Sequence, residues 1–234
     1  MLKQHTRKIG DIVRRLRGDM KTPGQRFAAW IEMVLMDHGI FRLIYSNTHS
    51  VSPMMYRASQ PSPGQIARMA RLGVKTIVNL RGARDGGEYL LEKEACARDG
   101  ITLIDFPVSS RDAPRKTDAR NLKELFARIE YPALLHCKSG ADRAGLGAAL
   151  YLHLHEGVPI EQAARQLHWK YGHFRQAKTG ILDFFFQTYG RHTATVQRDL
   201  LLWSESYYDP EALKRDFSTG RWSNFLVDKI LRRE

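Results

Sequence analysis

Helix-forming and strand-forming segments alternate regularly through the middle of the chain. Helical patterns fall at residues 62–72, 88–99 and 117–130, and short apolar runs fall at 74–80, 101–106 and 132–137. Strands separated by helices in this way are typical of parallel strands joined by helical crossovers. We therefore expect an α/β fold: a central, mainly parallel sheet with helices on both faces.

The first of these helices carries clear boundary signals. Ser62 can cap its N-terminus, Pro63 suits the first helical position, and Gln65 completes a capping box. Gly73 supplies the residue at which such helices end. These signals predict a helix that ends just before the apolar run at 74–80.

The two ends of the chain are helical in pattern and basic. We expect a helical extension over residues 1–50, the α/β domain over 51–190, and a helical extension over 191–234 that packs on the domain. Each end carries an amphipathic stripe: Ile9, Ile12, Val13 and Leu16 at the first, and Trp222, Phe225, Leu226 and Ile230 at the last. We expect residues 27–45 to pack on the domain. For residues 1–20 two predictions stay open: packing on the domain or lying on a membrane surface.

Composition limits the compartment and the partners. Two cysteines, at positions 96 and 137, make neither a disulfide framework nor a Cys-x-x-Cys zinc site, and they suit a reducing compartment. The basic N-terminus lacks the apolar core of a secretory signal, and charged residues interrupt the apolar stretch 27–45. We expect a cytoplasmic protein. Its net charge of +12 indicates an anionic partner: a phosphorylated substrate, anionic lipid or nucleic acid.

One cysteine lies in the stretch "LLHCKSGADRAG", residues 134–145. Cys137 follows the apolar run, and Arg143 stands where the next helical pattern begins. Loops at the carboxyl ends of parallel strands are ligand sites, and the N–H groups of a tight loop and of a helix N-terminus attract anions. Such a loop stabilises a thiolate, and a guanidinium grips two phosphate oxygens. The combination predicts attack on phosphorus, with the phosphoryl group passing to sulfur and then to water.

The spacing His-Cys-x-x-Gly-x-x-Arg, followed by Gly145, resembles the protein tyrosine phosphatase superfamily. The likeness is to its bacterial dual-specificity branch, which "YRASQP" (56–61), "VNLR" (78–81) and the order of segments also resemble. The resemblance implies a cysteine-based phosphatase domain over 51–190 that needs no metal or cofactor.

The resemblance also assigns roles in this loop. Cys137 is the nucleophile, and Arg143 binds phosphate together with the backbone of the loop. His136 either helps to hold the loop or is a structural histidine. The expected phosphate-binding residues are Lys138, Ser139, Gly140, Ala141, Asp142 and Arg143.

The resemblance further implies a carboxylic acid that protonates the leaving oxygen, on a loop before the nucleophile strand. Asp112, in "FPVSSRDAPRKTD", is the preferred candidate because its proline-flanked loop could close over the site. A turn aspartate is the alternative reading. Asp105 lies within the expected strand, and Asp118 is typical of a helix N-terminus.

Two positions depart from the family pattern. Ala144 stands where Ser or Thr commonly follows the arginine, and we hypothesise slower phosphocysteine breakdown or partial replacement by Ser139. Asp142 places an acid inside an anion-binding loop, as in some phosphoinositide phosphatases. We expect Asp142 to cap the following helix or to brace Arg143. The alternative is that it acts as the acid or positions water.

Four functions compete at this point. A phosphatase of phosphotyrosine or dual specificity on proteins comes first, and a phosphatase of anionic lipid, glycolipid or inositol phosphate head groups comes second. A binding module without catalysis is disfavoured because both Cys137 and Arg143 are present. No nucleic-acid motif accompanies the basic charge, so nucleic acid is not expected. Peripheral contact with an anionic inner membrane surface is open.

Residues outside the loop are expected to be structural. Cys96 is read as a small core residue within a helix, and Trp169, Tyr171 and Phe174 are read as packing residues. The histidines at 153, 155, 168 and 173 do not form a convincing metal set.

Overall fold

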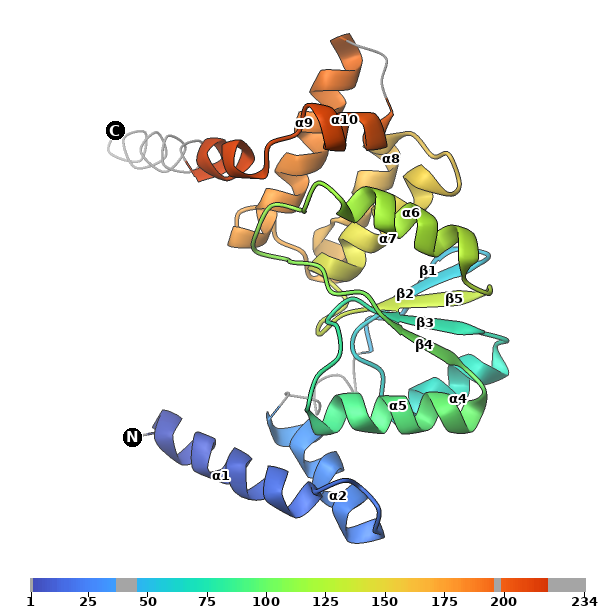
Figure 1. Ribbon diagram of the computed structural model, residues 1–234, viewed down its shortest axis with the longest axis vertical. Coiled ribbons are helices and arrows are strands. Elements are labelled where there is room, and N and C mark those ends of the chain that lie inside the picture. Colours follow the sequence, from blue (N-terminus) through green and yellow to red (C-terminus); the bar gives the residue numbers. More distant parts are fainter. Residues whose placement is uncertain (1, 37–45, 196–198, 219–234) are drawn as a thin grey trace. The chain divides into compact units, whose positions relative to one another are not determined.

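The computed structural model describes residues 2–36, 46–195 and 199–218 (Figure 1). By their contacts the residues fall into two compact units. The first comprises Met1–Pro107 and Ile129–Ala144, and the second comprises Val108–Arg128 and Gly145–Glu234. The organisation into segments 1–50, 51–190 and 191–234 stays a prediction.

A five-stranded sheet forms the centre of the first unit, in the order β1-β2-β5-β3-β4. The strands are β1 (His49–Ser52), β2 (Met55–Ala58), β3 (Thr76–Asn79), β4 (Thr102–Asp105) and β5 (Ala133–His136). β1 pairs antiparallel with β2, and the other three pairings are parallel. The prediction of a mainly parallel α/β sheet is confirmed.

The β1–β2 hairpin was not predicted from the sequence. β1 is the four-residue segment "HSVS", which is only partly buried, at one end of the strand order. A short polar strand of this kind lacks the apolar run that marks the buried strands. It protects the edge of the sheet and brings the preceding residues beside β2.

Helix α4 (Pro63–Arg71) begins and ends as its sequence predicts. The Ser62 side chain accepts a hydrogen bond from the Gln65 N–H, and the Gln65 side chain accepts one from the Ser62 N–H. Gly73 adopts φ +84°, a conformation that favours glycine. These features confirm the predicted capping box and stop signal.

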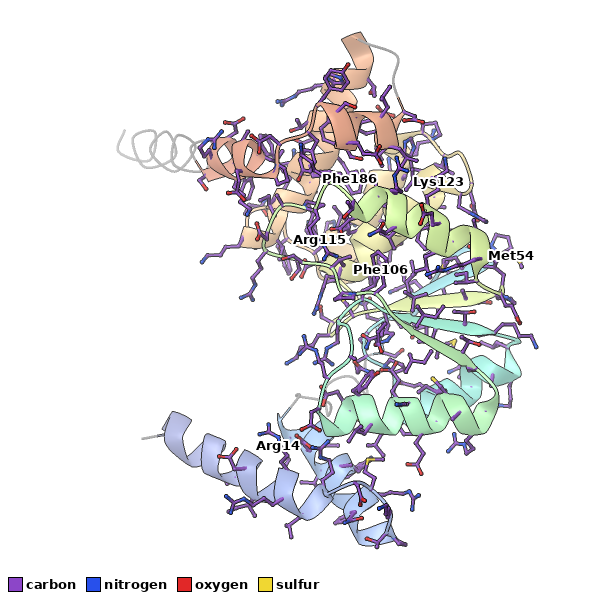
Figure 2. The ribbon with its side chains drawn as sticks, viewed as in Figure 1. Arg14, Met54, Phe106, Arg115, Lys123 and Phe186 are labelled. Carbon is purple, nitrogen blue, oxygen red and sulfur yellow. The ribbon has the colours of Figure 1, made fainter. Side chains whose placement is uncertain are left out.

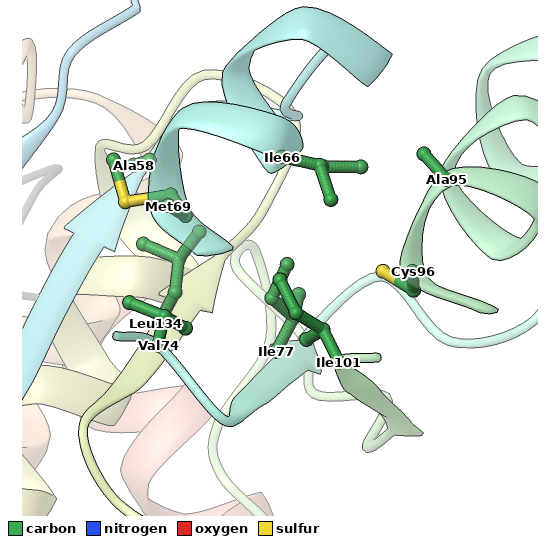
Figure 3. Close-up of a cluster of buried hydrophobic side chains, with 9 residues drawn as sticks. All are labelled: Ala58, Ile66, Met69, Val74, Ile77, Ala95, Cys96, Ile101 and Leu134. Atoms are coloured by element: carbon green, nitrogen blue, oxygen red, sulfur yellow. The ribbon is translucent and has the colours of Figure 1, made fainter. Parts of the chain in front are cut away.

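Helices α4 and α5 (Gly87–Asp99) pack on the sheet through a buried apolar cluster (Figure 3). The cluster comprises Ala58, Ile66, Met69, Val74, Ile77, Ala95, Cys96, Ile101 and Leu134. Cys96 is 1% exposed, and burial, with smaller contributions from nearby carboxylates, raises the pKa of its thiol to about 12. The prediction that Cys96 is a core residue is confirmed.

The N-terminal segment forms α1 (Leu2–Arg17), α2 (Pro23–Ile31) and the π-helical turn η1 (Glu32–Met36). Arg17 is buried and forms ion pairs with Glu32 and Asp85. A small apolar cluster joins α2 and η1 to α5. It comprises Met20, Ala29, Met33, Val34 and Leu91. The helical pattern predicted for this segment is confirmed up to residue 36, and residues 37–45 lie outside the described residues.

The second unit is helical. Its elements are α6 (Asp118–Arg128), α7 (Asp142–Leu154) from Gly145 onward, α8 (Ile160–Ala163), the 3₁₀ turns η2 (Ala164–Gln166), η3 (Trp169–Tyr171) and η4 (Lys178–Gly180), α9 (Ile181–Thr195) and α10 (Leu200–Ser206). Its aromatic core brings Phe185 and Tyr189 of α9 against Trp203, whose ring also lies 4.9 Å from that of Tyr208. The stripe predicted at 222–230 lies outside the described residues.

The packing role expected of three aromatic residues is only partly right. Tyr171 is buried, but Trp169 is 71% exposed and Phe174 is 60% exposed. Trp169 and Tyr171 lie two positions apart in η3, a single 3₁₀ turn, so they point in different directions. Across the described residues, no helix is both long and apolar enough to span a membrane.

Candidate active site

The loop after β5 holds the predicted nucleophile. β5 lies between β2 and β3, and all four of its residues are buried. Cys137 is the next residue, 2% exposed, and its N–H donates to the carbonyl oxygen of Ala58 at the end of β2, at 3.4 Å. Helix α7 begins at Asp142, so Arg143 lies in its first turn and is half-buried.

Four consecutive carbonyl groups of this loop accept hydrogen bonds from outside it. The Arg57 Nη2 donates to the oxygens of Gly140 (2.7 Å) and Ala141 (2.9 Å). The Asn47 Nδ2 donates to Ser139 O at 2.8 Å, and the Gln60 N–H donates to Lys138 O at 3.3 Å. In a trans peptide the N–H points away from the preceding C=O. The N–H groups of residues 139–142 therefore point away from these carbonyl partners, as in an anion-binding nest, and that of Ala141 donates to the Ser139 hydroxyl at 3.4 Å.

Gly140 lets the loop lie directly against the end of β2. Its φ is +75°, and a Cβ there would lie 2.7 Å from the Ser59 N and 2.8 Å from the Ala58 C. Ser59 cannot yield easily, because both its N–H and its hydroxyl donate to the Ser46 carbonyl oxygen. The glycine is required both by its backbone angle and by the close approach.

A chain of buried polar side chains continues from Gln60 in both directions. Gln60 Oε1 accepts from Arg81 Nη1 at 2.7 Å, and Gln60 Nε2 donates to Glu92 Oε2 at 2.7 Å. The other Glu92 oxygen lies 2.9 Å from Nε2 of His136 without completing a hydrogen bond, and Arg81 also donates to Glu88. These side-chain contacts link α5 to His136, the residue directly before Cys137, in keeping with a supporting role for His136.

Buried positive charge lies on the outer side of the loop. Arg57 is fully buried, and its guanidinium is held against two loop carbonyls. A cation at low dielectric interacts strongly with nearby charge, so Arg57 favours an anion in the nest. Phosphate binding stays a prediction for Lys138, Ser139, Gly140, Ala141, Asp142 and Arg143. Within the described part of the chain, no cluster of three or more His, Cys, Asp or Glu side chains forms a metal site.

The predicted acid, Asp112, lies in the second unit and is ion-paired. Its side chain is 52% exposed, and Oδ1 accepts from Lys214 Nζ at 2.8 Å and from the Ala113 N–H at 2.8 Å. This partner, together with Glu211, raises the pKa of Lys214. The same segment is fixed where the Tyr208 hydroxyl donates to the Pro114 carbonyl. The acid role of Asp112 stays a prediction.

The alternative carboxylates are engaged in structure. Asp105 accepts from Asn79 Nδ2 and from the Tyr89 hydroxyl; burial and this hydrogen bond raise the pKa of Tyr89 to about 12. Asp118 is buried at the start of α6 and accepts from the N–H and Nε of Arg115, as expected of a helix N-terminus. Asp142 is the first residue of α7, a position that fits the expected cap.

Three supporting residues were missed by reasoning from spacing alone. Arg57 belongs to the "YRASQP" stretch that the resemblance singled out, but its contact with the loop was not foreseen. An arginine inside an apolar strand was the available signal, because a buried charge needs partners. Asn47 and Glu92 carried no comparable signal, since isolated polar residues in a loop and a helix are common.

Residues 41–179 match the family described as "DSP-PTPase phosphatase fused to NAD+ Kinase". The chain belongs to this family. The matched range contains the sheet, the loop 137–143 and Asp112, so the family assignment covers every residue proposed for the site. It leaves α1, α2, η1, α9 and α10 outside.

Two curated relatives are similar over the same region. The chain is 30% identical over 151 residues to the dual specificity protein phosphatase TpbA of Pseudomonas aeruginosa, in strain UCBPP-PA14 and in strain PAO1. The match covers 63% of this chain and 61% of each relative, so the chain spans about three fifths of the relatives' length.

Solved structures of related fold were also found. The crystal structure of P. aeruginosa TpbA matches with a TM-score of 0.48 and 22% identity, covering 61% of this chain and 84% of that one. TpbA has also been crystallised in complex with phosphotyrosine; that structure matches with a TM-score of 0.45 and 21% identity, covering 62% and 90%. Human DUSP28 matches with a TM-score of 0.44 and 18% identity, covering 63% and 95%.

Proposed function

We propose that this protein is a cysteine-dependent phosphatase that hydrolyses phosphomonoesters through a phosphocysteine intermediate. One observation carries the proposal: four successive carbonyls of the loop 138–141, which follows Cys137, are held from outside, and this turns the following N–H groups to the opposite side. Such N–H groups stabilise the equatorial phosphoryl oxygens as charge develops on them. Membership of a phosphatase family supports the same conclusion.

The proposed reaction has two steps. In the first, the Cys137 thiolate attacks phosphorus, the bond from phosphorus to the leaving oxygen breaks, and Asp112 gives that oxygen a proton. In the second, water attacks phosphorus, the sulfur–phosphorus bond breaks, and the Asp112 carboxylate takes the proton of the water. Arg143 and the loop N–H groups hold the three remaining oxygens in both steps.

The ion pair between Asp112 and Lys214 bears on this scheme. The Lys214 Nζ lies 2.8 Å from Asp112 Oδ1, whereas the first step needs this carboxyl group to face the leaving oxygen. Asp112 therefore serves as the acid only after it has left Lys214. More than half of the Asp112 side chain is exposed, and solvent screens ion pairs at such positions, so this pair separates easily.

The substrate we favour is a phosphoprotein, with phosphotyrosine first and dual specificity included. The curated relative TpbA supports this choice, because its name describes a dual-specificity protein phosphatase and it has been crystallised with phosphotyrosine. Phosphorylated lipid or inositol head groups are the second candidate. Lys138 within the loop and the net charge of +12 favour a highly anionic substrate.

The test is phosphate release from a panel assayed side by side. The panel holds phosphotyrosine and phosphoserine peptides, a phosphoinositide and a phosphorylated glycolipid in vesicles, with Cys137→Ser and Arg143→Lys as the two control variants. We expect wild type to release phosphate fastest from phosphotyrosine peptide and both variants to lose at least about a hundred-fold. Activity that survives Cys137→Ser would contradict the cysteine mechanism, and a preference for lipid would replace the protein substrate.

A further inference from the structure

Exposed apolar side chains are concentrated at the N-terminal helices. Of the twelve large apolar side chains that are exposed among the described residues, six lie between Ile9 and Leu35. They are Ile9, Ile12, Leu16, Phe27, Trp30 and Leu35. Single exposed apolar residues need no explanation, but a cluster of this kind marks an interaction surface.

On α1 these residues form one stripe. Ile9, Ile12 and Leu16 follow helical spacing and are 49%, 56% and 63% exposed. Arg14 points from α1 to Glu32 of η1, with Nε 3.9 Å from Oε1 (Figure 2). Ile12 and Leu16 are each two residues from Arg14, about 200° around the helix. The stripe therefore lies on the side of α1 away from η1.

On α2 a pair of aromatic rings continues the apolar surface. Phe27 and Trp30 stack with ring centroids 6.4 Å apart and an interplanar angle of 10°, and they are 62% and 43% exposed. Ala29 is fully buried in the cluster with Leu91 of α5, and it lies about 200° around α2 from Phe27. The aromatic pair thus lies on the outer face of α2, turned away from α5. We call Ile9, Ile12, Leu16, Phe27 and Trp30 the apolar face.

The sequence that contains the apolar face is basic overall. Residues 1–36 contain eight Lys or Arg and three Asp or Glu. Arg15 is exposed and is the neighbour of Leu16 in the sequence. An apolar stripe with tryptophan and phenylalanine, in a basic segment with an exposed arginine beside it, is typical of helices that lie in the interfacial region of a membrane.

The positive charge of this segment distinguishes among the partners that could cover the apolar face. A second copy of the chain would bring the same basic helices to the interface, and like charges repel there. The C-terminal residues 219–234 carry four Lys or Arg and two acidic residues, so they too would add positive charge. An anionic lipid surface matches both properties of the face, since it accepts apolar side chains and attracts the cations around them.

We propose that the apolar face of α1 and α2 docks on an anionic membrane surface, with both helices lying in the plane of the interface. The helices do not insert across the bilayer, because α1 has 16 residues and mixes apolar with charged positions. Ile9, Ile12, Leu16, Phe27 and Trp30 enter the boundary between head groups and acyl chains, and Arg15 contacts lipid phosphates. This attachment concentrates the enzyme near substrates at the membrane.

Vesicle flotation of the full chain tests this proposal. One set of vesicles contains phosphatidylglycerol and phosphatidylcholine, and the other contains phosphatidylcholine alone. The face variant is Ile12→Ser/Leu16→Ser/Phe27→Ser/Trp30→Ser. The matched control is Trp169→Ser/Phe174→Ser, because these two aromatic residues are exposed but lie in the second unit. Circular dichroism and thermal unfolding check that each variant folds.

We expect wild type and the control variant to float with the anionic vesicles only, and to float less at high salt. The face variant should bind at least about ten-fold more weakly, because apolar contact supplies much of the binding free energy. Two results would overturn the proposal: wild type that stays unbound, or equal flotation of wild type and a folded face variant. None of these readouts depends on phosphatase activity.

Discussion

The two loops that carry the proposed chemistry are held in different ways. The loop 137–143 is fixed from outside by buried groups: Arg57 alone holds two of its carbonyls, and Gly140 fits against Ser59 with no space for a side chain. The loop with Asp112 has one buried anchor, the hydrogen bond from the Tyr208 hydroxyl to the Pro114 carbonyl, but the Asp112 side chain itself is held by an exposed ion pair with Lys214.

This difference matches what each loop has to do. Binding a phosphoryl group requires N–H groups that already point inward, because any reorganisation would cost part of the stabilisation. A general acid has to approach the leaving group and withdraw again, which exposed contacts permit. We therefore expect changes at the first loop to affect every substrate and changes at the second to depend on the leaving group.

The largest effect is expected from Gly140→Ala. A methyl group there would lie 2.7 Å from the Ser59 N at φ +75°, so the loop has to shift. A displacement of about 1 Å costs about a hundred-fold in activity, and we expect at least that loss on every substrate. The measurement is kcat/KM for a peptide and for p-nitrophenyl phosphate.

Gly100→Ala is the matched control for this change. Gly100 also has a positive φ, +69°, and belongs to the same unit, but a Cβ there meets nothing within 4 Å. It should lose about 1–3 kcal/mol of stability and keep its activity. Equal losses of activity in the two variants would mean that the close approach at Gly140 is unimportant.

Asp112→Asn should give the second largest effect. Without the acid, esters with poor leaving groups should react about a hundred-fold more slowly, whereas p-nitrophenyl phosphate should react at nearly the wild-type rate. The check is kcat against leaving-group basicity for wild type and for Asp112→Asn. Asp142→Asn is the parallel variant, and a steeper dependence there alone would move the acid role from Asp112 to Asp142.

Ala144→Ser is expected to have a moderate effect in the opposite direction. Ala144 is fully buried, and it lies directly after Arg143. A hydroxyl that donates to the leaving thiolate is worth about 1 kcal/mol, so breakdown of phosphocysteine should become about five-fold faster. Rapid-quench measurement of the two steps tests this, and an unchanged second step would show that the missing hydroxyl has no kinetic cost.

The smallest effect concerns alkaline stability of the unit that holds the first loop. Burial raises the pKa of Cys96 and of Tyr89 to about 12, above their ordinary values of 9.0 and 10.0. Above pH 9 the unfolded chain therefore releases protons that the folded chain retains, and stability falls as pH rises. The loss is at most about 1.4 kcal/mol per pH unit for Cys96, and it is smaller for Tyr89 because this residue is partly exposed and solvent screens it.

Urea unfolding at pH 8 and pH 10 measures this loss. In parallel, iodoacetamide at pH 8 should leave Cys96 unmodified until the chain unfolds, because burial raises the pKa of this thiol and only a thiolate reacts. Flat stability between the two pH values, or rapid labelling of native Cys96, would show that the packing around α5 is looser than described.

The sequence was most informative where one residue alone determines its local structure. Ser62, Pro63 and Gly73 predicted both ends of α4, and the apolar runs predicted β3, β4 and β5. The position of Cys137 after a buried strand followed from the same pattern. These features depend on local hydrogen bonding and burial, which a single segment specifies.

Features that depend on distant partners could not be predicted in this way. The hydrogen bonds of Asn47 and Arg57 to the loop join residues more than 80 positions apart. Lys214 and Asp112 are likewise distant in sequence, and neither carries a local signal of the other. The exposure of Trp169 contradicted an expectation from hydrophobicity alone, because a 3₁₀ turn decides which of its residues faces inward.

The most direct test of the account is to look for the covalent intermediate. Wild-type protein and Cys137→Ser are mixed with a phosphotyrosine peptide, quenched in acid within milliseconds, digested and analysed by mass spectrometry. The account predicts a phosphoryl group on Cys137 that appears before free phosphate accumulates, and no adduct or phosphate release with Cys137→Ser. Phosphate release without any adduct on Cys137, retained in Cys137→Ser, would contradict it.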